Sequence, residues 1–251
     1  MSNLLQAESL CWHGRVADVS LNVAAGELVG IIGANGAGKS SLLKLLAGLH
    51  RPDSGSIRLD GEALAQLTPQ QLARRRGYLE QRPVLHWPLS VQQVVALARL
   101  PHGDADSAAG RQTVDAALAT TGMLAFASRN FESLSEGEKM RSNLARLLAG
   151  QPRVLLADEP TAALDPARQQ EVMAILRQQA RSGSAVVVTL HELTLAARYC
   201  DRLVLLLQGR VLATGSAASV LTPALLAQGY EMDAYFDSTT ATVIVAAPRT
   251  I

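Results

Sequence analysis

One glycine-rich segment constrains the fold of this chain more than any other feature. Residues 33–40, GANGAGKS, fit the pattern G-x-x-x-x-G-K-[ST] of a phosphate-binding loop. The apolar run Leu28–Ile32 precedes it and predicts a buried strand, and the run that starts at Ser41 predicts a helix. A strand, a glycine turn and a helix in this order are the context in which such a loop binds nucleotide phosphates. We therefore expect a nucleotide site here.

The backbone of this loop explains why the pattern binds anions. Glycines let the chain curl so that successive N–H groups face one phosphate, and the N-terminus of the following helix adds its positive end. Lys39 is long enough to reach the β- and γ-phosphates, and the Ser40 hydroxyl is suited to Mg²⁺. The residues expected to bind nucleotide in this loop are Gly33, Asn35, Gly36, Gly38, Lys39, Ser40 and Ser41.

A second cluster of polar residues follows a buried strand later in the chain. An apolar run leads directly to Asp158 and Glu159, and ligands of open α/β sheets bind at the edge where the strands end. We expect Asp158 to hold Mg²⁺ together with Ser40, and Glu159 to orient or deprotonate the attacking water. His191 follows the strand Ala185–Thr189, which is expected beside the catalytic strand, so this histidine is placed to reach a γ-phosphate.

The chain alternates between strand and helix patterns except in one region. Only helix patterns occur between about residues 82 and 148, and the prolines at the entry of this insertion, Pro83 and Pro88 around Trp87, predict a stiff surface loop. The expected strands are Leu4–Cys11, Val16–Val23, Leu28–Ile32, Ser56–Gly61, Gly77–Gln81, Arg153–Ala157, Ala185–Thr189, Leu203–Leu207 and Thr242–Ala246. The expected helices are Ser41–Ala47, Thr68–Ala73, Ser90–Leu100, Arg111–Thr121, Glu138–Leu148, Asp165–Arg181, Leu193–Tyr199 and Ser216–Gln228.

Composition narrows the class of protein. A length of 251 residues with 48% hydrophobic content suffices for one large domain with an insertion. The net charge of +1 gives no bulk attraction to nucleic acid or to an anionic membrane. No apolar run approaches the roughly 20 residues of a membrane helix, and the first residues lack a signal-peptide pattern. Cys11 and Cys200 fit neither a metal spacing nor a disulfide framework, which favours reduced thiols in a cytoplasmic protein.

The segment LSEGE at residues 134–138 has a good local explanation. Ser135 and Glu138 have the S-x-x-E spacing of a capping box, which opens a helix and contributes about 1 kcal/mol. Capping does not explain why this segment comes shortly before the strand that ends in Asp158 and Glu159.

In this order the segments resemble the ATP-binding cassette ATPases, which are the motor subunits of ABC transporters. The resemblance covers residues 4 to about 215. It rests on Walker A at Gly33–Ser40, the Q-loop at Gln81, the signature at Leu134–Glu138, Walker B with the catalytic glutamate at Val154–Glu159, the D-loop at Ala162–Asp165 and the switch histidine at His191.

The resemblance implies a fold and a division of the chain. The fold class is α/β, with a P-loop NTPase (RecA-like) core, an N-terminal antiparallel β subdomain and an inserted α-helical subdomain. Residues 1–251 form a single nucleotide-binding domain in this scheme. Its parts are the catalytic core with the β subdomain at 1–81 and 149–215, the helical subdomain at 82–148, and a C-terminal extension at 216–251. The extension is expected either to support a dimer or to finish the sheet.

The resemblance also implies ATP and Mg²⁺ as cofactors, and it assigns further residues. Two copies pack head to tail, and Ser135 and Gly137 of one copy contact the γ-phosphate that the other copy holds. Gln81 lies near the metal and the attacking water, and Asp165 belongs to the site through the D-loop. Trp12 falls where the family places the aromatic residue that stacks on adenine. These roles follow from the resemblance and not from spacing.

A short cassette of this kind resembles a bacterial importer subunit. Such a subunit docks peripherally on separate integral-membrane permeases at the cytoplasmic face of the inner (plasma) membrane. A periplasmic or surface substrate-binding protein is an indirect partner, and nucleic acid is not a partner. Residues 81–102 and 190–201 resemble the group that imports iron chelates, haem and vitamin B12. Import of an iron complex, a siderophore or similar, is the first choice, and haem and vitamin B12 import are the alternatives.

Two other classes of protein are alternatives to the importer subunit, namely non-transport ABC ATPases and P-loop kinases. ABC ATPases of DNA repair carry long coiled coils, and those of translation usually carry two cassettes, but neither feature occurs in this sequence. A P-loop kinase is opposed by the signature segment and by the pair Asp158 and Glu159.

One departure from the family pattern generates a prediction. The usual signature is L-S-G-G-[QE], and Glu136 stands at the first glycine. We expect its carboxylate to point away from the phosphate and to favour the helix N-terminus. Glu136→Gly should therefore change steady-state ATP turnover only a few-fold relative to the wild-type protein, which is less than about 1.4 kcal/mol. A large gain in turnover would contradict this expectation.

Overall fold

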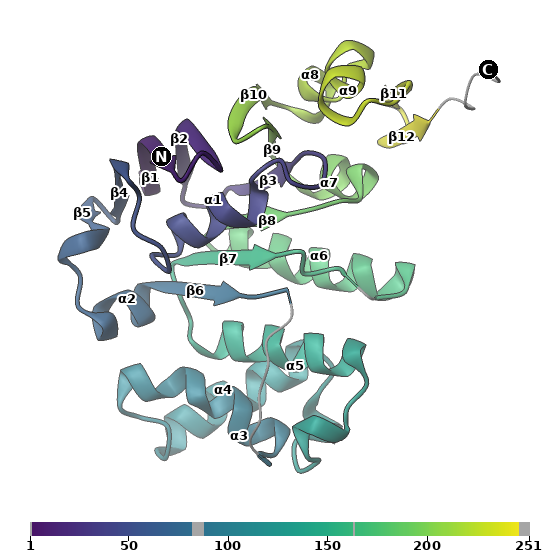
Figure 1. The fold of residues 1–251 in the computed structure, drawn as a ribbon. Coiled ribbons are helices and arrows are strands. Elements are labelled where there is room, and N and C mark those ends of the chain that lie inside the picture. Colours follow the sequence, from purple (N-terminus) through teal and green to yellow (C-terminus); the bar gives the residue numbers. More distant parts are fainter. Residues whose placement is uncertain (1, 82–87, 163, 246–251) are drawn as a thin grey trace.

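The N-terminal part of the chain folds as an antiparallel sheet (Figure 1). The computed structural model describes residues 2–81, 88–162 and 164–245. The strand order in this sheet is β2-β1-β4-β5, with β1 at Asn3–Trp12, β2 at Val16–Ala24, β4 at Ser54–Leu59 and β5 at Glu62–Ala63. The predicted N-terminal antiparallel sheet is confirmed. β1 is longer than expected, so Trp12 is its last residue and not part of the loop that follows.

The second sheet carries the strands that precede the polar clusters. Its order is β10-β9-β3-β8-β7-β6, in which β10 is antiparallel to β9 and the other neighbours are parallel. Because parallel strands end at one edge, the residues after β3, β7 and β8 meet there. The bounds are β3 Leu28–Ile32, β6 Arg76–Leu79, β7 Val154–Asp158, β8 Ala185–Thr189, β9 Arg202–Leu207 and β10 Arg210–Gly215.

The parallel sheet is covered on both faces, which explains its continuous apolar runs. Every residue of β3, β7 and β8 is buried. Val29 and Ile31 of β3 pack with α1 (Lys39–Leu46) and the N-terminal sheet. Leu28 and Ile32, on the opposite face, pack with α6 (Pro166–Arg181), α7 (Leu193–Tyr199) and the helical region. The alternation of side chains along each strand therefore separates two hydrophobic cores.

The helical region lies beside the edge strand β6 (Figure 1). The predicted helix over Ser90–Leu100 is shorter, because α3 ends at Ala96 and the chain continues as a 3₁₀ turn, η2, which contains Pro101. The buried Arg99 of η2 pairs with Asp104 at 2.6 Å and donates to the carbonyl of Ala149 at 2.9 Å, at the end of α5. The bounds are α3 Val91–Ala96, η2 Leu97–His102, α4 Ala108–Thr120 and α5 Glu136–Ala149.

Short elements connect these layers. Thr68 caps the helix α2 (Pro69–Arg75) through a capping box, as the sequence predicts, and Ser90 caps α3 in the same way. Three 3₁₀ turns were not predicted among the described residues, η1 at Leu64–Gln66, η3 at Leu124–Phe126 and η4 at Phe131–Ser133. The expected loop residues Pro83 and Trp87 lie outside the described residues, as do Ala163 of the D-loop and Ala246 of the last expected strand.

The C-terminal extension differs from the prediction. The single helical stretch expected at Ser216–Gln228 is two helices, because Thr222 caps a new helix and Pro223 occupies its first turn. The last strand pairs antiparallel with a strand that was not predicted, so it does not finish the main sheet. The bounds are α8 Ala217–Val220, α9 Pro223–Tyr230, β11 Ala234–Asp237 and β12 Thr242–Val245.

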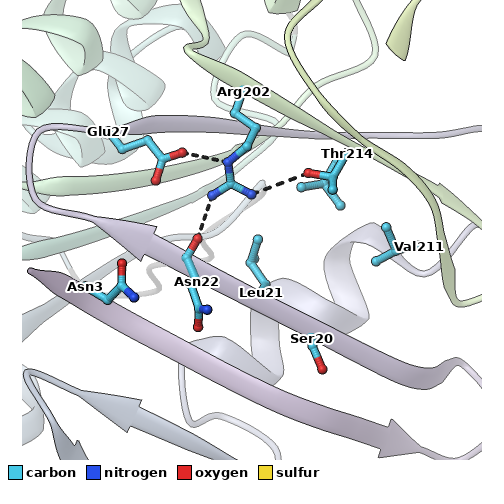
Figure 2. A pocket seen from close by; sticks show the side chains of 9 residues that line it. Asn3, Ser20, Leu21, Asn22, Glu27, Arg202, Val211 and Thr214 are labelled. Atoms are coloured by element: carbon cyan, nitrogen blue, oxygen red, sulfur yellow. Dashed lines mark hydrogen bonds and ion pairs between the residues drawn. The ribbon is translucent and has the colours of Figure 1, made fainter. Parts of the chain in front are cut away.

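A cavity of about 440 Å³ lies where the two sheets meet (Figure 2). Arg202 at the start of β9 crosses it, and its guanidinium donates to Glu27 Oε1 at 2.7 Å, to the Asn22 carbonyl at 2.5 Å and to Thr214 Oγ1 at 3.4 Å. The guanidinium thus connects β2, the residue before β3, and β10. The polar contacts in this cavity therefore hold the two sheets together. Among the described residues, no helix combines the length and the apolar character needed to span a bilayer.

Candidate functional site

The glycine-rich loop connects β3 to α1 in a conformation that only glycine adopts easily. Gly38 is the N-cap of α1 and has φ of 102°. A Cβ atom at this position would lie 2.5 Å from the carbonyl oxygen of Arg15, in the turn between β1 and β2. A side chain at residue 38 would therefore both strain the backbone and push the loop away from the N-terminal sheet.

A cavity of about 460 Å³ opens above this loop. Glu159 and His191 face it from the ends of neighbouring strands, so the edge of the parallel sheet brings both predicted clusters together. The complete lining is Arg15, Asn35, Gly36, Ala37, Gly38, Lys39, Ser40, Ser41, Glu159 and His191.

Lys39 is the buried cation of the site, with 6% of its surface exposed. Its ammonium group donates to the Gly33 carbonyl at 2.7 Å and to the Ala34 carbonyl at 3.1 Å. Burial lowers the pKa of Lys39, and the nearby carboxylates of Glu159 and Asp158 act in the opposite direction. The loop carbonyls thus hold the lysine beside the cradle in which phosphates are expected.

Asp158 connects the loop to two strands. Its Oδ1 atom accepts hydrogen bonds from the Ser40 hydroxyl at 3.0 Å and from the Thr189 hydroxyl at 2.6 Å. The hydroxyl of Thr189 also accepts the backbone N–H of Glu159 at 2.8 Å. The predicted pairing of Ser40 with Asp158 is present, and Thr189 is a residue that the sequence analysis missed, because a threonine ending an apolar strand carries no motif.

The carboxylate of Glu159 contacts the other two predicted catalytic side chains, those of Gln81 and His191. Its backbone has φ of 48°, in the left-handed region that residues with a side chain rarely adopt. One oxygen of its carboxylate accepts from the Gln81 amide, and the other lies within hydrogen-bonding distance of His191 Nε2. Gln81 follows β6, Glu159 follows β7 and His191 follows β8, so three adjacent strand ends place these groups around one carboxylate.

The signature segment is built as a helix start. Ser135 caps α5, and its hydroxyl and backbone N–H both donate to the Glu138 carboxylate at 2.8 Å. Glu136 is exposed and its carboxylate pairs with Lys139 at 2.9 Å. Neither Ser135 nor Gly137 is among the residues that line the cavity of the same chain.

Gly33, Gln81 and Asp158 are also absent from the cavity lining, and two further predicted residues, Trp12 and Asp165, make contacts elsewhere. Trp12 stacks on the ring of His50, with ring centroids 4.6 Å apart and an interplanar angle of 13°. Asp165 is the N-cap of α6 and accepts the backbone N–H of Arg168 at 3.0 Å. The adenine contact of Trp12 and the D-loop role of Asp165 therefore stay predictions. Arg15 lines the cavity and was not predicted, because it lies in a turn outside every motif.

The chemistry of these groups fits a nucleotide with a hard cation. The cradle offers backbone N–H groups, a helix N-terminus and one lysine, which are donors for phosphate oxygens. The carboxylate of Asp158 and the hydroxyl of Ser40 are oxygen ligands of the kind that Mg²⁺ prefers. Glu159 lines the same cavity, and a carboxylate is a group that can act as a general base toward water.

Comparison with known proteins gives matches in sequence and structure. A family profile described as "ABC transporter" matches residues 16–162. The hemin import ATP-binding protein HmuV of Bordetella pertussis is 45% identical over 228 residues, which cover 87% of each chain. A solved ATP-binding subunit of an ABC transporter superposes with a TM-score of 0.78 at 30% identity, over 86% of this chain and 91% of that one. A dimeric ATP-binding cassette with ADP and Pi bound has a TM-score of 0.76 at 27% identity, over 85% of this chain and 98% of that one.

The carboxylate of Glu159 generates the first prediction from this geometry. Glu159→Gln keeps the size of the side chain but removes the base, so we expect ATP binding to be retained while hydrolysis falls by about a hundredfold or more. Equilibrium nucleotide binding and steady-state phosphate release measure the two quantities. Glu192→Gln, a change at an exposed neighbour of His191, is the matched control. Turnover near wild type in Glu159→Gln would remove this residue from the catalytic role.

Thr189 generates a second prediction. Thr189→Val keeps the shape of the side chain but removes the hydroxyl that orients Asp158 and binds the Glu159 N–H. We expect kcat to fall about ten- to a hundredfold, as for other groups that orient metal ligands. Thr189→Ser retains a hydroxyl and should recover most of the rate, and Thr120→Val, at the exposed last residue of α4, should leave it unchanged. Equal rates for the valine and serine variants would show that the hydroxyl has no such role.

Proposed function

The chain belongs to the ABC transporter family and is a transporter ATPase, and from this premise we propose that it powers the import of haem. The sequence favoured an iron-siderophore complex and kept haem as an alternative. The observation that carries the proposal is the 45% identity with a hemin import ATP-binding protein along 87% of both chains. This relationship supports the haem alternative better than the siderophore, and vitamin B12 import is the weaker alternative.

We propose that ATP binds in the cavity of about 460 Å³ with the phosphates on the glycine-rich loop. Lys39 and the loop N–H groups would bind the phosphates. Ser40 and Asp158 would hold Mg²⁺, with Gln81 nearby, and the ion would neutralise phosphate charge. Glu159 would take the proton of the attacking water. The support is the hydrogen bond from Ser40 to Asp158 and the contact of the Gln81 amide with Glu159 at the same edge of the sheet.

His191 and Gln81 contact the two oxygens of the same carboxylate. In the proposed cycle they hold Glu159 in position until nucleotide enters, and His191 then contacts the γ-phosphate. Because both side chains contact the carboxylate at the end of β7, a γ-phosphate that drew His191 away would change how Glu159 is held. His191 is 44% exposed, which is consistent with a partner arriving from outside the chain.

The site is proposed to be completed by a second copy in a head-to-tail dimer. Ser135 and Gly137 do not line the cavity of their own chain, and their segment presents a capped helix N-terminus at the surface. A C₂ arrangement would place this segment against the γ-phosphate of the partner. The dimeric ATP-binding cassette with ADP and Pi, at 27% identity, supports this arrangement.

The remaining partners follow from the family. ABC ATPases of importers act with membrane permeases, and we propose that this chain docks peripherally on integral permease subunits at the cytoplasmic face of the inner membrane. The helical region at residues 82–148 would carry the motion to the permease. A substrate-binding protein outside the membrane would be an indirect partner.

The proposal is tested by transport. The chain is co-purified with the permease that it binds in cells, reconstituted into liposomes with the substrate-binding protein of that permease, and supplied with ATP and hemin, a ferric siderophore or cobalamin. We expect ATP-dependent uptake of hemin at least about tenfold above the other two, since a site built for one ligand commonly discriminates by more than 1.4 kcal/mol.

Two controls separate transport from binding. Glu159→Gln should abolish uptake while the complex still assembles, and Glu192→Gln should not change uptake. Uptake of the siderophore or cobalamin without hemin would overturn the haem assignment and leave the ATPase assignment intact.

A further inference from the structure

The C-terminal extension reaches the glycine-rich loop through one side chain. The helix α9 packs along β9 and β10 (Figure 1) and ends at Tyr230. The hydroxyl oxygen of Tyr230 accepts the backbone N–H of Gly33 at 2.7 Å. Gly33 is the first residue of the phosphate-binding pattern, so a residue outside the region of family resemblance touches the nucleotide loop.

The approach of α9 to the sheet is close and leaves little freedom. A Cβ atom on Gly229 would lie 3.2 Å from the side chain of Leu205 in β9, so glycine at this position lets the helix come near. Gly33 is equally confined, because its φ is 148° and a Cβ atom there would lie 2.5 Å from the Leu206 carbonyl oxygen. Tyr230 and Gly33 are therefore held at fixed positions on either side of β9.

The peptide groups around Gly33 connect the tyrosine to the phosphate-binding lysine. The N–H of Gly33 donates to Tyr230, and the carbonyl of Gly33 accepts from Lys39 Nζ at 2.7 Å. Burial raises the pKa of Tyr230, which keeps its hydroxyl neutral and able to accept this bond across the physiological range. Gly33 thus contacts the C-terminal extension through its N–H and the ammonium group of Lys39 through its carbonyl.

The other end of the extension holds the helix that follows His191. Arg198 of α7 donates to the carbonyls of Thr240 and Ala241, both at 3.3 Å, and to the Thr242 hydroxyl at 3.1 Å. The hydroxyl of Thr194, also in α7, accepts the backbone N–H of Val243 at 3.2 Å. The segment from α9 to β12 therefore contacts the glycine-rich loop through Tyr230 and, at its other end, the helix α7, which begins two residues after His191.

We propose that Tyr230 is a positioning residue for the nucleotide loop, and that the C-terminal extension braces this loop against α7. The hydroxyl satisfies the N–H of Gly33, a residue that does not itself line the cavity. Without the hydroxyl, that partly buried donor would seek another partner and the loop would leave its binding-competent shape for part of the time. Nucleotide would then have to restore that shape. The apparent affinity for nucleotide would fall in proportion to the fraction of molecules whose loop has the binding-competent shape.

The test is Tyr230→Phe in the full chain, which removes only the hydroxyl. We expect the dissociation constant for MgADP, measured by calorimetry, and the KM for ATP to rise about five- to tenfold, with kcat changed less than about twofold. Tyr235→Phe is the matched control, since Tyr235 lies in β11 of the same extension and is 49% exposed. It should leave both constants unchanged.

The alternatives give different results. A lower melting temperature with an unchanged dissociation constant would overturn the proposal, because the hydroxyl would then only stabilise the fold. A fall in kcat at constant KM would overturn it as well. If Tyr230→Phe does not fold, Arg198→Gln tests the other end of the brace, where a rise of about threefold in the dissociation constant is expected and no change would contradict the brace.

Discussion

The arrangement of the site depends on the hydrogen bonds that the carboxylate of Asp158 accepts. This residue is almost completely buried, with 3% exposure, and a buried carboxylate is costly unless it is hydrogen-bonded. The hydroxyls of Ser40 and Thr189 both donate to it, so the first turn of α1 and the end of β8 are fixed to the end of β7. Because Thr189 also accepts the Glu159 N–H, the same contact determines where the next carboxylate emerges.

From this fixed point the chain turns sharply to present Glu159 to the cavity. The left-handed backbone of Glu159 is unfavourable for a residue with a side chain, and such strain persists where the surroundings hold it. The Thr189 hydroxyl on one side and the side chains of Gln81 and His191 on the other hold it here. The carboxylate of Glu159, the oxygens of Ser40 and Asp158, and the ammonium group of Lys39 therefore lie around one edge of the sheet, and the proposed dimer would add the signature segment of a second chain.

In the proposed function the cavity binds ATP, a ligand that members of the family share, so the geometry of the cavity is uninformative about the transported molecule. The cargo passes through a permease, and this chain never contacts it in the proposed complex. The haem assignment accordingly depends on the overall similarity to a hemin import protein and not on any side chain of the site. Glu136 of the signature is likewise uninformative about the transported molecule, since its side chain is exposed and pairs with Lys139 of the same helix.

The sequence by itself determined the parallel sheet and the residues at its edge. Continuous apolar runs at Leu28–Ile32 and Ala185–Thr189 specify buried strands, and the glycine pattern specifies the loop between strand and helix, because both are local consequences of burial and backbone freedom. The capping box of Ser135 and Glu138 is also a local feature, and its prediction is confirmed.

Only the tertiary structure decided which distant residues meet. Thr189 and Arg15 belong to the site because strand order and a turn of the N-terminal sheet bring them there, and neither carries a local signal. The extension was expected as one helical stretch and a last strand that either supports a dimer or finishes the sheet, but it forms two helices and a separate hairpin, and Tyr230 at the end of α9 reaches Gly33, 197 residues away. Contacts of this kind depend on packing between elements, which periodicity along one element does not encode.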